Sequence, residues 1–176
     1  NSGPWVLLNT LTASNSATLS DTTSLTSAYS EYEIVFENII PATNLDQLSL
    51  TVHSGGSYQS GANTYDYRLL LSSSHDVATS AAFTANRMIL SSSGAGFGIG
   101  SAATEGFNGF LRVSKPTNTT VYKQWGGEAT YANSTNFLGG TVSQRWSGGT
   151  GAIDGFQVFM SSGNITSGII RIYGRL

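Results

Sequence analysis

Hydrophobic and polar residues alternate along most of this chain, with the period of two that is typical of β-strands that bury one face. Between Gln47 and Ser54, for example, Leu48, Leu50 and Val52 share one face and polar side chains occupy the other. The same pattern predicts strands at residues 5–12, 32–40, 47–54, 65–72, 87–92, 107–114, 121–131, 142–146, 156–160 and 169–173.

Glycine, serine, asparagine and proline gather between these segments, as they do in turns. Strands joined in this way form two antiparallel sheets packed face to face, or a barrel, so we predict an all-β fold. Helix is expected only at residues 74–83, where Ser74 or Asp76 can cap a turn or two. Residues 91–106 are rich in glycine and serine and predict a long loop.

Length and composition limit the classes of protein to consider. The chain has 176 residues, which favours one domain over residues 5–176, preceded by a linker or trimmed boundary at residues 1–4. With 39% hydrophobic residues it is not a disordered protein, although only 10% of its residues are charged. A net charge of −2 argues against a nucleic-acid partner, and no apolar stretch is long enough to predict insertion into a membrane.

Metal and cofactor sites are not expected from the sequence. Its aspartates are scattered, it has no cysteine, and two histidines, His53 and His75, are too few for a zinc site. We expect both histidines to be surface side chains. A calcium ion held by loop carbonyls would leave no mark in the sequence. The run Gly94–Gly100 lacks the lysine of a phosphate-binding loop and is interpreted as a flexible or tightly turning loop.

Enzymatic activity is not expected either. Glu33 and Glu37 share one strand face, but at about 3.3 Å per residue they lie roughly 13 Å apart, which is too far for a glycosidase pair. Glu128, near Trp125, is the best single candidate for a catalytic acid, yet it has no evident partner. Serine is so frequent that a chance Ser/His/Asp combination carries no information.

Aromatic residues beside turns are the remaining lead. Trp125 and Trp146 are each followed by glycine-rich segments, so their rings could lie near strand ends and stack on the apolar faces of sugars. The alternative for both tryptophans is a place in the core, and Trp5 is expected in the core or packed at an edge. The candidate glycan-binding residues are Trp125, Trp146, Tyr58, Tyr65, Asp66, Glu128 and Arg145.

Several segments resemble bacteriophage tail proteins. They are Trp5–Leu11 with the following Thr12-Ala13-Ser14, then Tyr32–Thr43 followed by Leu48-Ser49-Leu50, and the closing Gly168–Gly174. The resemblance covers both ends of the chain and most of its length. It implies the distal or C-terminal domain of a tail fibre or tailspike, which in that family is a β-sandwich, often a jelly roll, and usually a homotrimer.

The resemblance also implies a function on the virion, outside the cell. Such domains bind bacterial surface polysaccharide or lipopolysaccharide, and a trimer multiplies weak contacts through avidity. The leading expectation is therefore a non-catalytic receptor-binding domain without a cofactor. Two alternatives stay open: a trimerisation or capping domain of a fibre that binds no ligand, and an accessory domain of a polysaccharide depolymerase.

Overall fold

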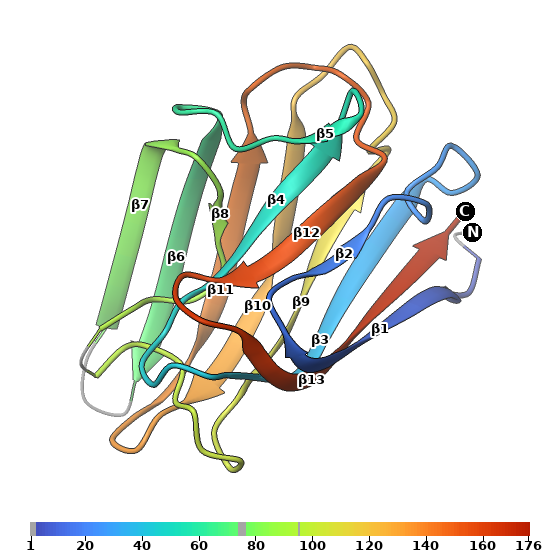
Figure 1. Ribbon diagram of the computed structural model, residues 1–176. Coiled ribbons are helices and arrows are strands. Elements are labelled where there is room, and N and C mark those ends of the chain that lie inside the picture. The colour runs from blue at the N-terminus through green and yellow to red at the C-terminus, as the bar shows by residue number, and fades with distance from the viewer. Residues whose placement is uncertain (1–2, 74–76, 95) are drawn as a thin grey trace.

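Two antiparallel sheets packed face to face make up the computed structural model, which describes residues 3–73, 77–94 and 96–176 (Figure 1). The large sheet contains β1 (Val6–Ser16), β3 (Glu31–Pro41), β6 (Tyr65–Ser73), β7 (Val77–Ala85), β9 (Phe107–Ser114), β10 (Lys123–Ala132), β11 (Phe137–Trp146) and β13 (Ile165–Arg175). The small sheet contains β2 (Leu19–Asp21), β4 (Leu48–Ser54), β5 (Ser57–Tyr58), β8 (Met88–Ile89) and β12 (Gly155–Met160).

The strand order confirms an all-β sandwich. Strands of the large sheet lie in the order β1-β13-β3-β9-β10-β11-β6-β7, and those of the small sheet in the order β2-β12-β4-β5, with β8 also paired to β4. This order does not confirm a jelly roll. The first and last strands are neighbours, so both ends of the chain lie at the same corner (Figure 1).

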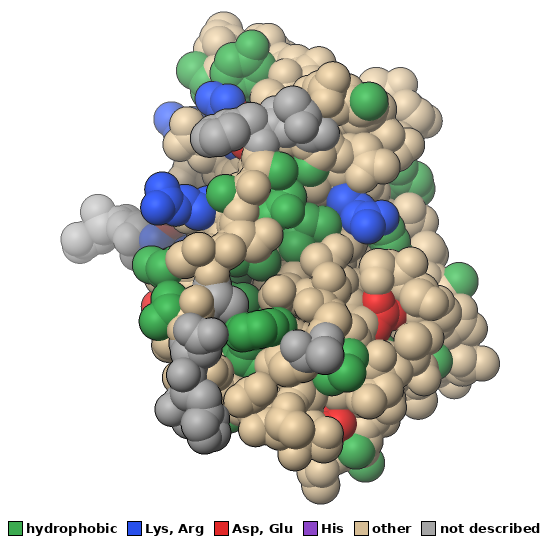
Figure 2. All heavy atoms as spheres, turned by 90° about the vertical axis from the view of Figure 1, so that its left-hand side faces the viewer, with side chains coloured by type: hydrophobic (Ala, Val, Ile, Leu, Met, Phe, Trp, Pro, Cys, Tyr) green, Lys and Arg blue, Asp and Glu red, His purple; other side chains and the backbone are tan. Residues whose placement is uncertain are grey.

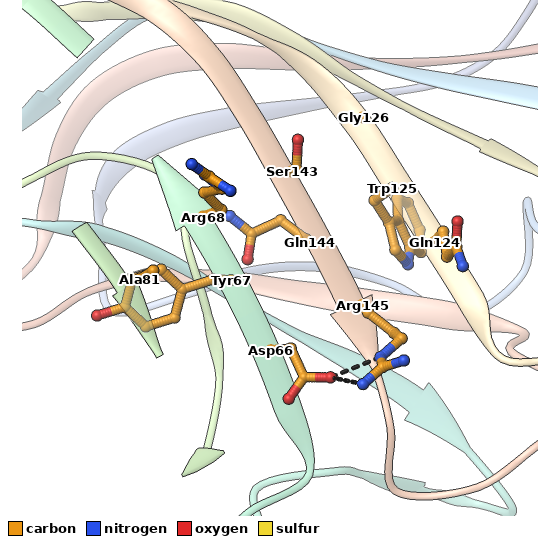
Figure 3. A pocket seen from close by; sticks show the side chains of 10 residues that line it. All are labelled: Asp66, Tyr67, Arg68, Ala81, Gln124, Trp125, Gly126, Ser143, Gln144 and Arg145. Atoms are coloured by element: carbon orange, nitrogen blue, oxygen red, sulfur yellow. Dashed lines mark hydrogen bonds and ion pairs between the residues drawn. The ribbon is translucent and has the colours of Figure 1, made fainter. Parts of the chain in front are cut away.

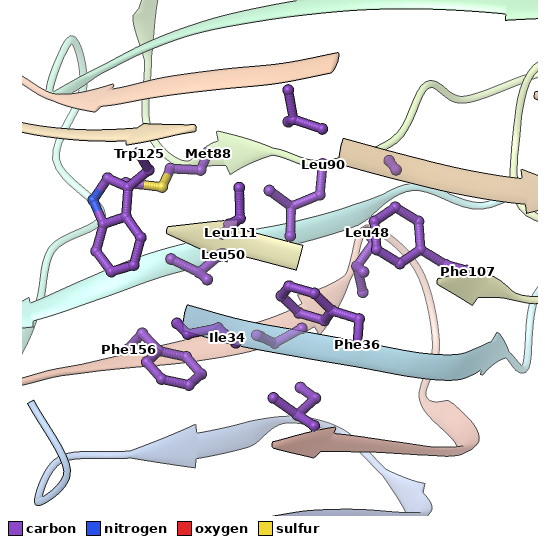
Figure 4. Close-up of a cluster of buried hydrophobic side chains, with 14 of the residues drawn as sticks. Ile34, Phe36, Leu48, Leu50, Met88, Leu90, Phe107, Leu111, Trp125 and Phe156 are labelled. Carbon is purple, nitrogen blue, oxygen red and sulfur yellow. The ribbon is translucent and has the colours of Figure 1, made fainter. Parts of the chain in front are cut away.

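The core lies between the inward faces of the two sheets (Figure 4). Leu48, Leu50 and Phe156 of the small sheet pack against Ile34 and Phe36 of the large sheet, and all five side chains are buried. Burial of each such side chain stabilises the fold by about 1.5–3 kcal/mol. The period-two alternation of the sequence is the direct consequence of this arrangement.

The predicted helix at residues 74–83 is wrong where the structure describes it, because Val77–Ala85 forms strand β7. This segment pairs with β6 over the register Ser72↔Val77 to Tyr65↔Ala85, and that tertiary pairing overrides the weak helical signal of its alanines. Residues 74–76, with His75 and the proposed caps, lie outside the described residues. No helix in the described part of the chain is long and apolar enough to cross a membrane.

The predicted apolar face of residues 47–54 is confirmed, because Leu48, Leu50 and Val52 belong to the core. Ser49 and Thr51 are buried although they face away from the core. Ser49 lies opposite Phe159 in the register and Thr51 lies opposite Gln157, so larger neighbouring side chains cover these short ones. The burial of a small polar residue on an outer face therefore depends on the size of its cross-strand neighbours. It cannot be predicted from the sequence of its own strand.

The loop predicted at 91–106 is confirmed for the residues that the structure describes there, and it is fixed at its centre. Asp46 and Ile99 exchange two backbone hydrogen bonds, of 3.1 and 2.9 Å, and Ile99 is fully buried. The Asp46 carboxylate accepts hydrogen bonds from the backbone of Ser162 at 3.1 Å and from the hydroxyl of Ser161. Asp46 therefore joins this loop to the turn between β12 and β13.

Candidate functional site

Neither predicted tryptophan platform is available at the surface. Trp125 is only 2% exposed and Trp146 only 4%, and both belong to the core. Their indole Nε1 atoms are buried without a hydrogen-bond partner among the described residues. A buried ring cannot stack on a sugar unless the core opens, so the core interpretation replaces the sugar-platform interpretation for both residues.

Tyr65 and Tyr58, two further candidate glycan-binding residues, both make contacts within the fold. The hydroxyl of Tyr65 is buried, accepts a 2.9 Å hydrogen bond from the backbone of Val52 and donates one of 2.7 Å to the carbonyl of Gln59. Burial raises the pKa of this hydroxyl well above its ordinary value. Tyr58, on the small sheet, packs its ring edge-on against His53, next to the Val52 and Gln59 backbone groups that bind the Tyr65 hydroxyl.

His53 is mostly buried, which corrects the expectation of a surface side chain. Its side chain is 16% exposed, and its Nδ1 lies 2.5 Å from Oδ1 of Asp154, whose side chain is half exposed. The pair joins β4 to the segment that precedes β12. No group of three potential metal-binding side chains occurs among the described residues, so this pair does not extend to a metal site.

Asp66 and Arg145, two of the predicted residues, do lie together on the outer face of the large sheet. They are opposite each other in the register of β6 and β11, and Nε of Arg145 donates a 2.5 Å hydrogen bond to Oδ2 of Asp66 (Figure 3). Gln124 of β10 lies opposite Arg145 on its other side. This row of three polar side chains forms one wall of a surface hollow.

The hollow measures about 510 Å³ and lies over β10, β11 and β6 (Figure 3). Its second row is formed by Gly126, Ser143 and Arg68, which are consecutive partners across the three strands. Between the two rows lie Trp125, Gln144 and Tyr67, whose inward orientation leaves their backbone at the floor. The hollow exists because glycine and serine stand where neighbouring positions carry long side chains.

A second hollow of about 430 Å³ adjoins the first across β10. It shares Gln124 with the first hollow, and its other lining residues are Arg112, Ser114, Val121 and Tyr122. We call the two hollows together the outer groove.

Solvent-facing aromatic rings border this groove. Tyr122 is 49% exposed, and the Arg145 guanidinium lies 5.6 Å from its ring centre. Arg112 lies 4.8 Å from the ring centre of Phe110 and 5.6 Å from that of Trp5. Contacts of this kind hold a guanidinium over one face of the ring. Trp5 directly precedes the edge strand β1 and does not belong to the core, so of its two expected places the core is wrong.

Lys123 fixes the segment that carries Tyr122. Its side chain is buried, and its ammonium donates hydrogen bonds to the carbonyls of Val121, Thr150 and Gly151 at 2.9, 2.9 and 3.0 Å. All three N–H donors of the ammonium are thus satisfied by backbone oxygen. Burial lowers the pKa of this amine. Lys123 is the link between the groove and the loop that precedes β12.

Glu128 lies on the same outer face but does not line the groove. It is exposed and stands opposite Phe110 on one side and Thr141 on the other. The groove lining itself contains one carboxylate, that of Asp66, which is paired with Arg145. Hydrolysis of a glycosidic bond uses two carboxylates that flank the bond. The chemistry that this lining can supply is hydrogen bonding, ring stacking and charge.

The alternation of odd and even positions along β10 contained a signal for this site. Trp125, Ala129 and Tyr131 all have odd numbers, and all three are buried. The even-numbered residues of β10, among them Gln124 and Gly126, must then face solvent, because successive side chains of a strand point to opposite faces. Tyr122 belongs to this outward set. Trp125 was predicted instead because a glycine-rich segment follows it. The register that brings Arg68 beside Gly126 and Ser143 depends on strands distant in sequence, and no local pattern reveals it.

Comparison of the chain with protein-family models, with curated proteins and with solved structures gives no match.

Proposed function

We propose that this domain is a non-catalytic carbohydrate-binding domain, and that the outer groove binds its ligand. The observation that carries the proposal is the lining of the groove: amide, hydroxyl and guanidinium groups beside the exposed ring of Tyr122. Sugars present apolar C–H faces that stack on aromatic rings, and hydroxyls that pair with such polar groups. Two adjoining open hollows suit a chain of sugar units.

The biological role that we propose is recognition of a bacterial surface polysaccharide or lipopolysaccharide by a phage tail. The resemblance of the β1, β3 and β13 segments to tail proteins supports this role. A shallow groove makes few contacts, so each site is expected to bind weakly. Assembly as a homotrimer would raise the overall affinity through avidity.

The direct test is binding of the purified domain to an array of bacterial capsular polysaccharides and lipopolysaccharides. We expect binding to some members, and competition by the soluble saccharide. Release of reducing ends from a bound polysaccharide would instead favour a depolymerase component. Absence of binding across the array would contradict the proposed function.

A second candidate function, assembly without a ligand, is favoured by the edges of the large sheet. Both edge strands, β1 and β7, lack charged residues and proline. Natural edge strands usually carry such residues, which prevent pairing with another chain. On the side of the molecule that carries β7, hydrophobic side chains lie between Lys or Arg side chains (Figure 2).

Light-scattering mass tests this second candidate. If β7 pairs between copies, the domain should be oligomeric, and Thr79→Lys on the exposed face of β7 should reduce the mass to that of one chain. A monomeric parent protein would exclude assembly through this edge. An oligomer that also binds saccharide would combine both functions.

A further inference from the structure

Arg68 differs from the other arginines of the outer face in its lack of a counter-ion. Four arginines on the outer face of the large sheet are ion-paired with carboxylates. Arg87 lies elsewhere, over the ring of Phe159 on the small sheet. Arg68 is exposed on β6 and has no ion pair among the described residues. The four pairs are Arg112–Glu33, Arg145–Asp66, Arg171–Glu37 and Arg175–Glu31.

This free guanidinium lies in the groove. Arg68 stands opposite Ser143, which stands opposite Gly126, so no bulky side chain lies between Arg68 and the floor of the hollow. The nearest lining carboxylate, that of Asp66, is already held by Arg145. The planar fork of Arg68 is therefore available to a bound molecule, and its geometry matches an anionic group with two oxygens.

The charge of the groove is opposite to that of the chain. Three arginines and one aspartate line it, a net charge of +2, whereas the whole chain carries −2. Glu33, which pairs with Arg112, reduces the local value to +1. Glu128 is the remaining acid nearby, exposed on the next outward position of β10 after Gly126. A positive groove on an acidic protein favours an anionic ligand over the same ligand without charge.

We infer that the outer groove takes an acidic saccharide, and that Arg68 binds its anionic group. This inference rests on the proposed carbohydrate-binding function and narrows its ligand class. The anion is a carboxylate or a phosphate on the sugar chain, because both present paired oxygens to a guanidinium. Gln124, Ser143 and Tyr122 then contact the uncharged part of the saccharide.

The test starts from an array that contains acidic and neutral bacterial polysaccharides. For each acidic member that binds, affinity is measured by calorimetry before and after removal of its charge, by carboxyl reduction or by dephosphorylation. We expect the charged form to bind about ten- to a hundred-fold more tightly, as charged hydrogen bonds provide. The two treatments distinguish a carboxylate from a phosphate.

The variant Arg68→Gln removes the positive charge and retains an N–H donor, that of the glutamine amide. It should bring the affinity for the charged form down to that for the uncharged form, with the latter unchanged. Arg68→Lys should recover part of the preference, because an ammonium keeps the charge and loses the planar fork. Glu128→Gln, which changes the charge of the same face without touching the groove, should change affinity by less than about three-fold.

The outcomes separate the inference from the function on which it rests. Binding of neutral members alone, or a charge preference that survives in Arg68→Gln, would overturn the role of Arg68 and retain carbohydrate binding. Equal and opposite effects of Arg68→Gln and Glu128→Gln would also overturn it, since they would indicate general attraction only. Failure to bind any member would reject carbohydrate binding itself. Circular dichroism spectra and melting temperatures of the variants should match those of the parent.

Discussion

Gly126 and Ser143 face each other across β10 and β11, and the missing side chain of Gly126 leaves the space that becomes the first hollow of the groove. A β-carbon built on Gly126 meets no atom within 4 Å. The variant Gly126→Leu should therefore fold and fill the groove. We expect saccharide binding to weaken by about ten-fold or more, while stability stays equal or rises by about 0.5–1 kcal/mol.

The control for this variant is Thr141→Leu. Thr141 is exposed on the same face, next to Glu128, but does not line the groove. It introduces the same side chain outside the proposed site, so its binding should equal that of the parent. Equal loss in both variants would mean that the groove is not where the saccharide binds.

Tyr122 and Trp125 are expected to separate binding from folding. Tyr122→Ala removes a half-exposed ring, so affinity for saccharide should fall by about ten-fold, with little change in melting temperature. Trp125→Ala removes a buried ring and leaves a cavity, so the free energy of unfolding should fall by about 3–5 kcal/mol. Urea titrations and calorimetry on both variants measure the two effects. A stable Trp125→Ala protein that no longer binds would restore Trp125 as a sugar platform.

Removal of the Lys123 ammonium should loosen the loop before β12. Lys123→Met keeps the aliphatic chain but leaves three carbonyls without their donor, so we expect the free energy of unfolding to fall by about 3 kcal/mol. Amide exchange around Thr150 and Gly151 should accelerate. Lys115→Met, at an exposed position, is the matched control and should change neither quantity.

Asp21 should make stability depend on acid pH. Burial alone would raise the pKa of its carboxyl, but hydrogen bonds from the Asn9 side chain, Ser24 and the Thr23 backbone outweigh burial and lower the pKa below 3.8. A lowered folded-state pKa means that the stabilisation is complete above the ordinary value and disappears as pH falls through the folded-state value.

The variant Asp21→Asn should therefore be less stable than the parent by about 1–3 kcal/mol at neutral pH. The difference should shrink as the pH falls below 3.8, where the carboxyl of the parent becomes protonated. Urea denaturation of both proteins between neutral and strongly acidic pH measures it. A difference that stays constant over this range would show that the carboxylate charge contributes nothing.

The layered β-fold could be predicted from the sequence because alternation records which face of each strand is buried. Both ends of Phe107–Ser114 were predicted correctly, and Leu48, Leu50 and Val52 were predicted to share the face that proves to be the core. Where alternation weakens, prediction failed. β7 contains mostly alanine, serine and threonine, and its pairing with β6 determines its conformation.

The site was harder to predict because it depends on register between distant strands. Asp66 and Arg145 were selected separately, and only the pairing of β6 with β11 shows that they form one ion pair. Trp125 and Trp146 were selected for the glycines that follow them, which suggested strand ends near solvent. Their orientation is set by the alternation of side chains along each strand. Both tryptophans occupy inward positions, so their rings lie in the core.

The pairing of β1 with β13 brings Gly3 and Leu176 to one corner of the sandwich, with consequences for protein engineering. A short bridge across this corner could close the polypeptide into a ring. New termini could then be opened at Gly55 and Gly56, which form an exposed turn with positive φ angles of 61° and 82°. Such a circular permutant would keep every strand pair and place its termini between β4 and β5 of the small sheet.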